Sequence, residues 1–251
     1  MFLSKLRSLL TVMEFQGAFR AAMTWPKFSL ASFLIISRLK RANISPRTII
    51  DLGANIGQFA VAAANLFDSA KIFSIEPDPR TADQLKQNLD AYKQAAVIVA
   101  AVGDSVGSAE FFVNKDAQVS SMLKLGKERV REFPQSIIVE KITVPVTTLD
   151  TLFHDHDLDQ PILVKIDVQG FEDRVIRGAK EFLKSTEWVV MEVSFADLYE
   201  GERDFKSLLE LMDENGFQFI RPLNYHFSPF SGQIIEMDAL FKNESKQKGN
   251  R

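Results

Sequence analysis

The sequence predicts an α/β fold in which helices cover both faces of a mostly parallel β-sheet. From residue 48 onward, short apolar runs alternate with helix-like segments, and this alternation is typical of parallel strands joined by right-handed helical crossovers. The 251 residues suit one large α/β domain, and 21 phenylalanines supply ample core material. We therefore expect a helical extension over residues 1–45, the α/β domain over 46–241 and a polar tail over 242–251.

The first alternation begins directly after the N-terminal extension. Apolar runs predict three strands, and the segments between them predict two helices, the second of which begins at Pro79, a residue favoured in the first helical turn. In chain order, the expected elements are a strand at 48–51, a helix at 58–67, a strand at 71–75, a helix at 79–91 and a strand at 96–99. Together these segments make two strand–helix–strand units.

The pattern changes after the third strand, where two strand-like runs indicate an inserted hairpin followed by a short helix. The expected bounds are 108–113 and 137–146 for the strands and 148–153 for the helix. A polar connection that contains Ser120 and Ser121 joins the two strands. Because a loop of this kind can close over a bound molecule, both serines are candidates for binding the acceptor of a transferred group.

The alternation resumes in the last third of the chain. The run at 162–166 is apolar apart from Lys165, as expected for a strand that is buried on both faces. The last helix is expected to end before Gly216, since glycine commonly follows a helix C-terminus. The remaining expected elements are helices at 171–183 and 204–215 and strands at 188–193, 217–220 and 234–241.

Composition excludes several classes of protein. The formal net charge is -3 and the sequence pI is about 5.7. The chain therefore lacks the excess of basic residues that would indicate a nucleic-acid partner. The chain has no cysteine, which excludes a disulfide framework, a zinc–thiolate site and a thiol nucleophile. Absence of cysteine fits a reducing compartment, and we expect a cytoplasmic location.

The N-terminal segment has mixed basic and apolar character. Residues 1–13 are interrupted by charge and lack a small-residue cleavage site, so they predict an amphipathic helix rather than a signal peptide. No apolar run reaches the ~18 residues that a membrane-spanning helix needs. We therefore expect no transmembrane segment.

A loop with two glycines follows the first strand. In Asp51-Leu52-Gly53-Ala54-Asn55-Ile56-Gly57-Gln58, Asn55 stands where a dinucleotide-binding loop carries its middle glycine. A loop with fewer glycines suits a ligand without a pyrophosphate, such as S-adenosylmethionine. Gly53 allows the backbone to approach that ligand closely, and Gly57 lets the helix start tightly against the strand.

Acidic residues at the ends of the first three strands complete the predicted cofactor site. Glu76 follows the second strand, where a carboxylate can accept hydrogen bonds from both ribose hydroxyls. Asp51 can face the ammonium group of the cofactor, and Asp104 can accept a hydrogen bond from the adenine amino group. The predicted cofactor-binding residues are Asp51, Gly53, Asn55, Gly57, Glu76 and Asp104.

A second group of charged residues surrounds the strand at 162–166. Lys165 and Asp167 are two residues apart, so their side chains share one face of the strand, and Glu192 lies near the end of the next strand. Methyl transfer to a hydroxyl benefits from a general base and from orientation of the acceptor. We expect Asp167 to act as the base or to orient the acceptor, with Lys165 and Glu192 binding the acceptor or tuning Asp167. Glu172, at the start of the following helix, is a further candidate for acceptor binding.

No metal site is expected. A cluster of carboxylates can bind Mg²⁺, but the sequence does not supply a complete ligand set. The segment His154-Asp155-His156 lies in a polar loop without a third ligand nearby in the sequence, so we interpret it as a solvated loop.

The chain resembles the FkbM-type methyltransferases. The resemblance rests on Asp51–Gln58, Glu76-Pro77, Val144–Asp150 and Lys165–Glu172, in matching order and spacing, and on Glu192 in the later strand. It covers roughly residues 44–241. The first motif is shared by many class I methyltransferases, whereas the Val144–Asp150 and Lys165–Glu172 motifs are far more specific.

The resemblance implies a Rossmann-like sheet of seven strands whose last strand is antiparallel. It also implies S-adenosylmethionine as the methyl donor and O-methylation of hydroxyls, commonly on sugars, glycans or polyketide-type metabolites. One position departs from the family pattern, since Gln169 stands where an acid is usual in this motif. Glutamine keeps the hydrogen bonding of that position but not its charge.

Three other functions are weighed against this one. An RNA 2′-O-methyltransferase would use a similar set of Lys, Asp and Glu residues, but the acidic chain shows no basic stripe. An NAD-binding oxidoreductase is disfavoured by the missing middle glycine and by the lack of a Tyr-x-x-x-Lys pair. A non-catalytic domain that has kept the fold is disfavoured by the intact Asp51, Glu76 and Asp167. The expected partner is a small-molecule or glycan acceptor.

Overall fold

The structure is a computed structural model that describes residues 10, 13–14, 16–25 and 28–245. The amphipathic helix expected over residues 1–13 lies outside this part, apart from Leu10 and Met13, and so do residues 246–251 of the expected tail. Among the described residues, no helix combines the length and the apolar character required to cross a bilayer.

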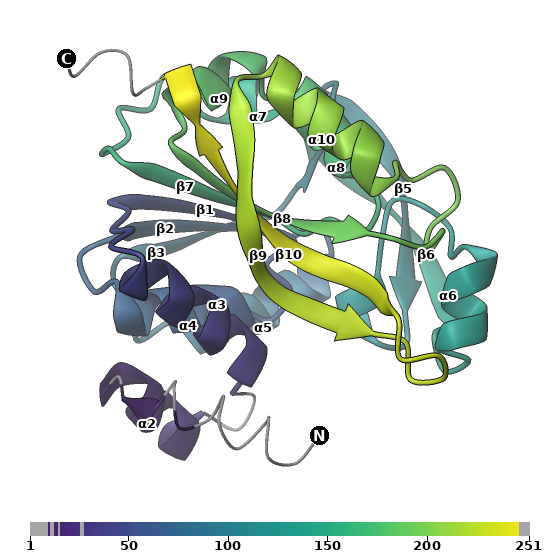
Figure 1. Cartoon of the computed structure of the whole chain (residues 1–251), viewed down its shortest axis with the longest axis horizontal. Coiled ribbons are helices and arrows are strands. Elements are labelled where there is room, and N and C mark those ends of the chain that lie inside the picture. Colours follow the sequence, from purple (N-terminus) through teal and green to yellow (C-terminus); the bar gives the residue numbers. More distant parts are fainter. Residues whose placement is uncertain (1–9, 11–12, 15, 26–27, 246–251) are drawn as a thin grey trace.

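A seven-stranded sheet forms the centre of the molecule (Figure 1). Its strands are β1 (Thr48–Leu52), β2 (Lys71–Ile75), β3 (Ala95–Ile98), β7 (Ile162–Ile166), β8 (Trp188–Ser194), β9 (Phe217–Phe227) and β10 (Ile234–Asn243). The strand order is β3-β2-β1-β7-β8-β10-β9, and neighbouring strands from β3 to β8 are parallel. β10 runs antiparallel between β8 and β9. The predicted mostly parallel sheet with an antiparallel last strand is confirmed.

Helices cover both faces of this sheet. They are α2 (Gln16–Thr24), α3 (Leu30–Arg41), α4 (Gln58–Leu66), α5 (Pro79–Leu89), α7 (Leu149–Leu152), α8 (Glu172–Arg177), α9 (Lys180–Ser185) and α10 (Phe205–Glu214). α3, α4 and α5 lie on one face, and α7 to α10 lie on the other (Figure 1). A hydrophobic core lies on each face of the sheet. Adjacent residues of β1 point to opposite faces, so Ile49 packs in the core with α3 and α4 and Ile50 packs in the core with α8 to α10.

A small second sheet follows the third strand. It contains β4 (Ala101–Val102), β5 (Gly107–Asn114) and β6 (Ile138–Thr147), and β5 pairs antiparallel with β6, which confirms the expected hairpin. The connection between β5 and β6 contains a 3₁₀ turn (Ala117–Val119) and the helix α6 (Lys127–Glu132), neither of which was predicted. β4 was also missed, because a two-residue strand carries no periodicity.

The helix predicted over residues 171–183 is wrong in one respect, since the structure divides it into α8 and α9. The break falls at Gly178, where an added Cβ would overlap the carbonyl oxygen of Gly103. The Gly178 carbonyl also accepts a hydrogen bond from the backbone N–H of Asp150 at 3.2 Å. Close contact with two other segments therefore interrupts the helix at this point.

The last two strands are longer than predicted. β9 continues to Phe227 through Pro222, which an edge strand tolerates because it need not donate on its open side. β10 extends two residues beyond the expected end at 241, and the Asn243 side chain is buried and donates to the carbonyl oxygens of Leu183 and Thr186. The polar tail therefore starts later than the predicted residue 242.

The N-terminal extension shares the core of the sheet. Phe33, Ile36 and Leu39 on α3 are fully buried and belong to the core that also contains α4. The Ser29 side chain accepts a hydrogen bond from the backbone N–H of Ser32 and thereby caps the N-terminus of α3. This packing fixes the first turn of α3 beside the carboxyl ends of the strands.

Candidate active site

A row of polar side chains crosses the sheet on the face covered by α3 and α4. Asp51 of β1 is in register with Ser74 of β2 and with Lys165 of β7. Farther along the sheet, Glu192 of β8 is in register with Asp238 of β10. Because in-register residues of neighbouring strands face the same side, the sheet brings together charged residues that are far apart in the sequence.

A cavity of about 460 Å³ opens at the carboxyl ends of the parallel strands. This volume lies within the range of small-molecule sites. The part of its wall that we call the loop side includes Gly53, Asn55, Glu76, Pro77, Val102 and Phe171. The part that we call the hairpin side, after the hairpin formed by β9 and β10, includes Ser32 of α3, Arg129 of α6, Asn224 and His226 of β9, and Glu236 and Asp238 of β10.

Gly53 is required by close packing between two loops. Its φ of +71° lies in the left-handed region, and an added Cβ would overlap the carbonyl oxygen of Asp167. Asn55 also has a positive φ, of 49°, and its side-chain oxygen has no hydrogen-bond partner among the described residues. The glycine loop thus lies directly against the loop that follows β7, and Asn55 lines the cavity while its side-chain oxygen is buried without a partner among the described residues.

Gly57 has a packing role. Its φ is +98°, and an added Cβ would lie 2.9 Å from Leu85 of α5. Gly57 precedes the first residue of α4 and is not among the residues that line the cavity. The expected tight start of the helix is present, but Gly57 itself lies behind the wall.

Glu76 lies at the end of β2 on the loop side of the cavity. Its carboxylate accepts hydrogen bonds from the backbone N–H of Asn55 at 2.9 Å and from that of Asp78 at 3.1 Å. Burial raises the pKa of Glu76 to about 7, although these two hydrogen bonds favour the charged form. Glu76 therefore orders the glycine loop and still presents a carboxylate to the cavity.

Asp51 is completely buried beside Lys165 and does not line the cavity. Neither of its carboxylate oxygens has a hydrogen-bond partner among the residues described. Burial raises the pKa of Asp51 to about 7, and the positive charge of Lys165 opposes this shift. An acid in this position can influence the charge of the site without touching a ligand in the cavity.

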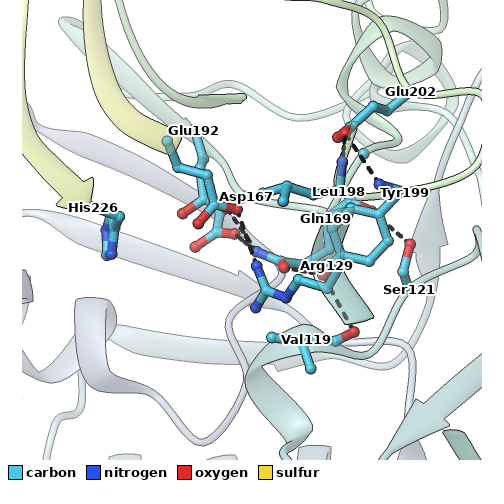
Figure 2. Close-up of polar contacts among 12 residues, drawn as sticks. Val119, Ser121, Arg129, Asp167, Gln169, Glu192, Leu198, Tyr199, Glu202 and His226 are labelled. Carbon is cyan, nitrogen blue, oxygen red and sulfur yellow. Dashed lines mark hydrogen bonds and ion pairs between the residues drawn. The ribbon is translucent and has the colours of Figure 1, made fainter. Parts of the chain in front are cut away.

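Asp167 is the centre of a buried network. Its carboxylate accepts hydrogen bonds from the ammonium group of Lys165 at 2.6 Å and from the side-chain amide of Gln169 at 2.7 Å. The same amide nitrogen lies 2.7 Å from Glu192 (Figure 2). Gln169 therefore links the two carboxyl groups through one amide nitrogen.

The two bridged carboxylates differ in charge state. Burial alone would raise the pKa of Asp167, but the charge and hydrogen bond of Lys165, together with the hydrogen bonds of Gln169 and Glu192, outweigh burial and lower it. Burial raises the pKa of Glu192 well above its ordinary value, and the negative charge of Asp167 adds to this. Asp167 is therefore ionised near neutral pH, whereas Glu192 keeps its proton.

Gln169 is held in place from several directions. Its φ is 58°, and the Tyr199 hydroxyl donates to its side-chain oxygen (Figure 2). The hydroxyl of Ser121 donates to its backbone carbonyl at 2.6 Å. The Ser121 hydroxyl also accepts a hydrogen bond from the backbone N–H of Leu123, so it both donates and accepts within the protein.

Besides Gly57 and Asp51, three more of the predicted site residues do not line the cavity. Ser121 is buried behind Gln169, and Glu172 accepts hydrogen bonds from the backbone N–H groups of Val168 and Gly170, each at 3.2 Å. Asp104 is exposed and contacts Ser105 rather than the cavity. Ser120 does line the cavity, and its hydroxyl accepts from the backbone N–H of Asn114.

The hairpin side of the cavity contains residues that the sequence did not reveal. Arg129 and Glu236 are both buried, and the guanidinium Nη1 lies 3.3 Å from the carboxylate. His226 Nε2 lies 3.8 Å from a carboxylate oxygen of Asp238. The signal for Glu236 and Asp238 was present, since two acids two residues apart share one face of a predicted strand. Arg129 had no signal, because α6 was not predicted.

Comparison with known proteins identifies the family. A model of the FkbM methyltransferase domain matches residues 51–219. The chain is 29% identical to the 2-O-methyltransferase NoeI of Sinorhizobium fredii, over 65% of this chain and 70% of that protein. It is 28% identical to the hexuronic acid methyltransferase AglP of Haloferax volcanii, over 57% of this chain and 54% of that protein. It is 26% identical to methyltransferase sdnD of Sordaria araneosa, over 69% of this chain and 74% of that protein.

The matched span contains the glycine loop, Glu76 and the whole Asp167–Gln169–Glu192 network. It covers more than half of the chain, and the fold around it is the open, mostly parallel sheet that the resemblance implied. The chain belongs to the FkbM family of methyltransferases, enzymes that take their methyl group from S-adenosylmethionine.

Proposed function

We propose that this enzyme transfers a methyl group to a hydroxyl of a sugar, a glycan or a small hydroxylated metabolite. One relative is named for 2-O-methylation and another for methylation of a hexuronic acid. The hairpin side of the cavity supports the same chemistry, because carboxylates accept hydrogen bonds from hydroxyl groups readily. Asp167, Glu192, Glu236 and Asp238 all line that cavity.

The loop side of the cavity fits S-adenosylmethionine. Glu76 offers a carboxylate for the ribose hydroxyls, and Asn55 offers a side-chain oxygen that has no other partner among the described residues. Pro77, Val102 and Phe171 add apolar surface that can contact an adenine ring. We assign Gly53 to close approach of the backbone, with Gly57 and Asp51 supporting the loop from behind. We do not assign adenine binding to Asp104.

The bound cofactor supplies an electrophilic methyl group on a positively charged sulfur. The residues of this chain supply the rest. Asp167, kept ionised by Lys165, is placed to accept a hydrogen bond from the acceptor hydroxyl and so to orient it. Glu192, which keeps its proton, can donate a hydrogen bond to a neighbouring acceptor oxygen. Lys165 acts through Asp167, since its ammonium group contacts that carboxylate.

A single observation carries this proposal. One amide group, that of Gln169, joins an ionised and a protonated carboxylate at the end of adjacent strands, beside the glycine loop. A pair of carboxyl groups in opposite charge states offers an acceptor and a donor to the hydroxyls of a sugar. No basic surface is needed for such a substrate, which agrees with the net charge of -3.

Mass spectrometry tests the proposal directly. The purified protein is incubated with S-adenosylmethionine carrying a deuterated methyl group and with a panel of methyl glycosides, oligosaccharides and hydroxylated small metabolites. We expect one labelled methyl group per product molecule, located on oxygen by fragmentation. Label found only on nitrogen or carbon atoms, or only on added RNA, would overturn the proposal.

A further inference from the structure

Three of the carboxyl groups that line the cavity, those of Asp167, Glu192 and Glu236, are poorly suited to accept a proton from the substrate. Both oxygens of Asp167 already receive hydrogen bonds, from Lys165 and from Gln169. Glu192 keeps its own proton, and Glu236 is paired with Arg129. Each of these groups can bind or orient a hydroxyl, but none is an uncommitted base.

His226 differs from these residues in its surroundings. It lies on β9 in the hairpin side of the cavity, and it is the one imidazole among the described residues of the cavity wall. Its Nε2 lies 3.8 Å from the carboxylate of Asp238 and 3.4 Å from the amide nitrogen of Asn224. Its other ring nitrogen, Nδ1, makes no hydrogen bond within the part of the chain that the structure describes.

Asp238 is placed to orient the ring. The Asp238 side chain is 6% exposed, whereas that of His226 is 43% exposed, so a buried carboxylate holds an imidazole that opens onto the cavity. Of the two groups near Nε2, only the Asp238 carboxylate can accept a hydrogen bond from it, since the Asn224 amide nitrogen is a donor. An Nε2–H directed at Asp238 leaves the lone pair on Nδ1. This is the arrangement of a histidine base and its orienting acid.

Resting on the proposed function, we infer that His226 is the general base that takes the proton of the acceptor hydroxyl, with Asp238 as its positioning residue. A new bond joins the acceptor oxygen to the methyl carbon, and the carbon–sulfur bond breaks with its electron pair remaining on sulfur. The hydroxyl proton moves to Nδ1 of His226, whose imidazolium is stabilised by Asp238. The proton is then released to solvent through the exposed side of the ring.

The charges around His226 support this assignment. The neighbouring carboxylate of Asp238 raises the pKa of His226 above its ordinary value, although burial opposes the shift, and the charges of Glu236 and Asp167 add to the increase. Arg129 compensates Glu236, and Lys165 compensates Asp167. The surrounding acids therefore strengthen His226 as a base.

Nuclear magnetic resonance tests the dyad in the free protein, without cofactor or acceptor. The chain has three histidines, so comparison with the His226→Gln variant assigns the signals of His226. We expect the neutral ring to carry its proton on Nε2 and to titrate above about 6.5. In Asp238→Asn the pKa is expected to fall relative to the wild type. A proton on Nδ1, or no response of the His226 pKa to Asp238→Asn, would overturn the assignment.

Methyl-transfer kinetics test the role of the base. With the best acceptor from the glycoside panel, His226→Gln is expected to lower kcat by roughly 100-fold or more and to remove the acidic limb of the pH profile. Asp238→Asn is expected to move that limb to lower pH. His154→Gln, which changes a histidine in an exposed loop, serves as the matched control and should keep the wild-type profile. Cofactor affinity, measured by calorimetry, should be unchanged in all three variants.

The outcomes separate the two proposals. A wild-type enzyme that methylates hydroxyls, together with a fully active His226→Gln variant, would overturn the role of His226 and leave the proposed function in place. A wild-type enzyme that methylates only nitrogen, carbon or RNA would overturn the proposed function, and the role of His226 with it. Circular dichroism checks that each variant is folded, and a folded His226→Gln variant is expected because the His226 side chain is 43% exposed.

Discussion

The hydroxyl of Tyr199 donates to the side-chain oxygen of Gln169, and this contact decides which way the glutamine amide points. With its oxygen toward Tyr199, the amide presents its nitrogen to both Asp167 and Glu192. Burial raises the pKa of Tyr199 well above its ordinary value, so the phenol remains a donor throughout the working pH range. Tyr199, in the loop after β8, thereby orients the amide that donates hydrogen bonds within the buried network.

Tyr199→Phe should lower turnover and leave cofactor affinity unchanged. Without the phenol, the amide of Gln169 can rotate and turn its oxygen toward the carboxylates, which repels them. We expect roughly a 10-fold loss in kcat, corresponding to about one hydrogen bond. Gln169→Ala should produce a similar loss, and the double variant should lose little more than either single change. Additive losses would show that the two residues act separately.

Glu76→Ala should weaken the binding of S-adenosylmethionine by roughly 10- to 100-fold, because a hydrogen-bonded carboxylate is lost from the ribose end of the site. Affinity in the wild type should also rise with pH through about 7, where Glu76 loses its proton. Isothermal titration calorimetry between pH 6 and pH 8 checks both statements. Glu76→Gln serves as the control, since it keeps the size of the side chain and should lose the pH dependence.

Asp167→Asn should lower kcat by roughly 100-fold, since the acceptor hydroxyl loses the group that orients it. Cofactor affinity should stay within about twofold of the wild type. Asp104→Asn is the matched control, because Asp104 is exposed and lies outside the cavity wall. Single-turnover kinetics and calorimetry on the same preparations provide the comparison. A fully active Asp167→Asn variant would remove Asp167 from the mechanism.

Gly53→Ala should destabilise the protein far more than Gly232→Ala. Both glycines have a φ of +71°, so the backbone strain of the two substitutions is matched. The added Cβ would overlap the Asp167 carbonyl at position 53, whereas it would meet nothing within 4 Å at position 232. We expect a loss of about 1 kcal/mol for Gly232→Ala and at least about 2 kcal/mol more for Gly53→Ala, measured by chemical denaturation. Equal losses would contradict the close approach of the two loops.

Glu172→Gln should flatten the pH dependence of stability. Burial raises the pKa of Glu172 from 4.5 to about 8, so the folded state holds this proton more tightly than the unfolded chain does. The stabilisation is complete below pH 4.5 and is lost as the pH rises toward 8. Between pH 5 and pH 8 the wild type should lose on the order of 3 kcal/mol more than the variant. Denaturant titrations across this range check the difference, and identical pH slopes would refute it.

Much of the fold and the loop side of the cavity could be predicted from the sequence. The strands at 71–75 and 162–166 have the predicted bounds, because short apolar runs between turn residues are strong local signals. Glu76 and Asp167 were placed at the sheet edge because both follow the end of a parallel strand. The position of the first residues after such strands depends only on local pattern and topology.

The hairpin side of the cavity could not be predicted in the same way. His226 lies on a strand that was expected to end at residue 220, and Arg129 lies on a six-residue helix with no clear periodicity. Their contribution depends on long-range packing of the β9–β10 hairpin and the α6 loop against the sheet. Asp104 shows the opposite error, since a plausible turn acid at a strand end is directed to solvent.

The cavity wall combines residues from the span matched by the family model with residues from the segments that flank this span. Gly53, Glu76 and Asp167 lie inside the span shared with other FkbM proteins, whereas Ser32 precedes that span and His226 and Asp238 follow it. Exchange of the two flanking pieces between relatives would therefore alter one part of the cavity wall and leave Gly53 and Glu76 in place. A protein trimmed to the shared span would keep Gly53, Glu76 and Asp167 and lose Ser32, His226 and Asp238 from the cavity wall.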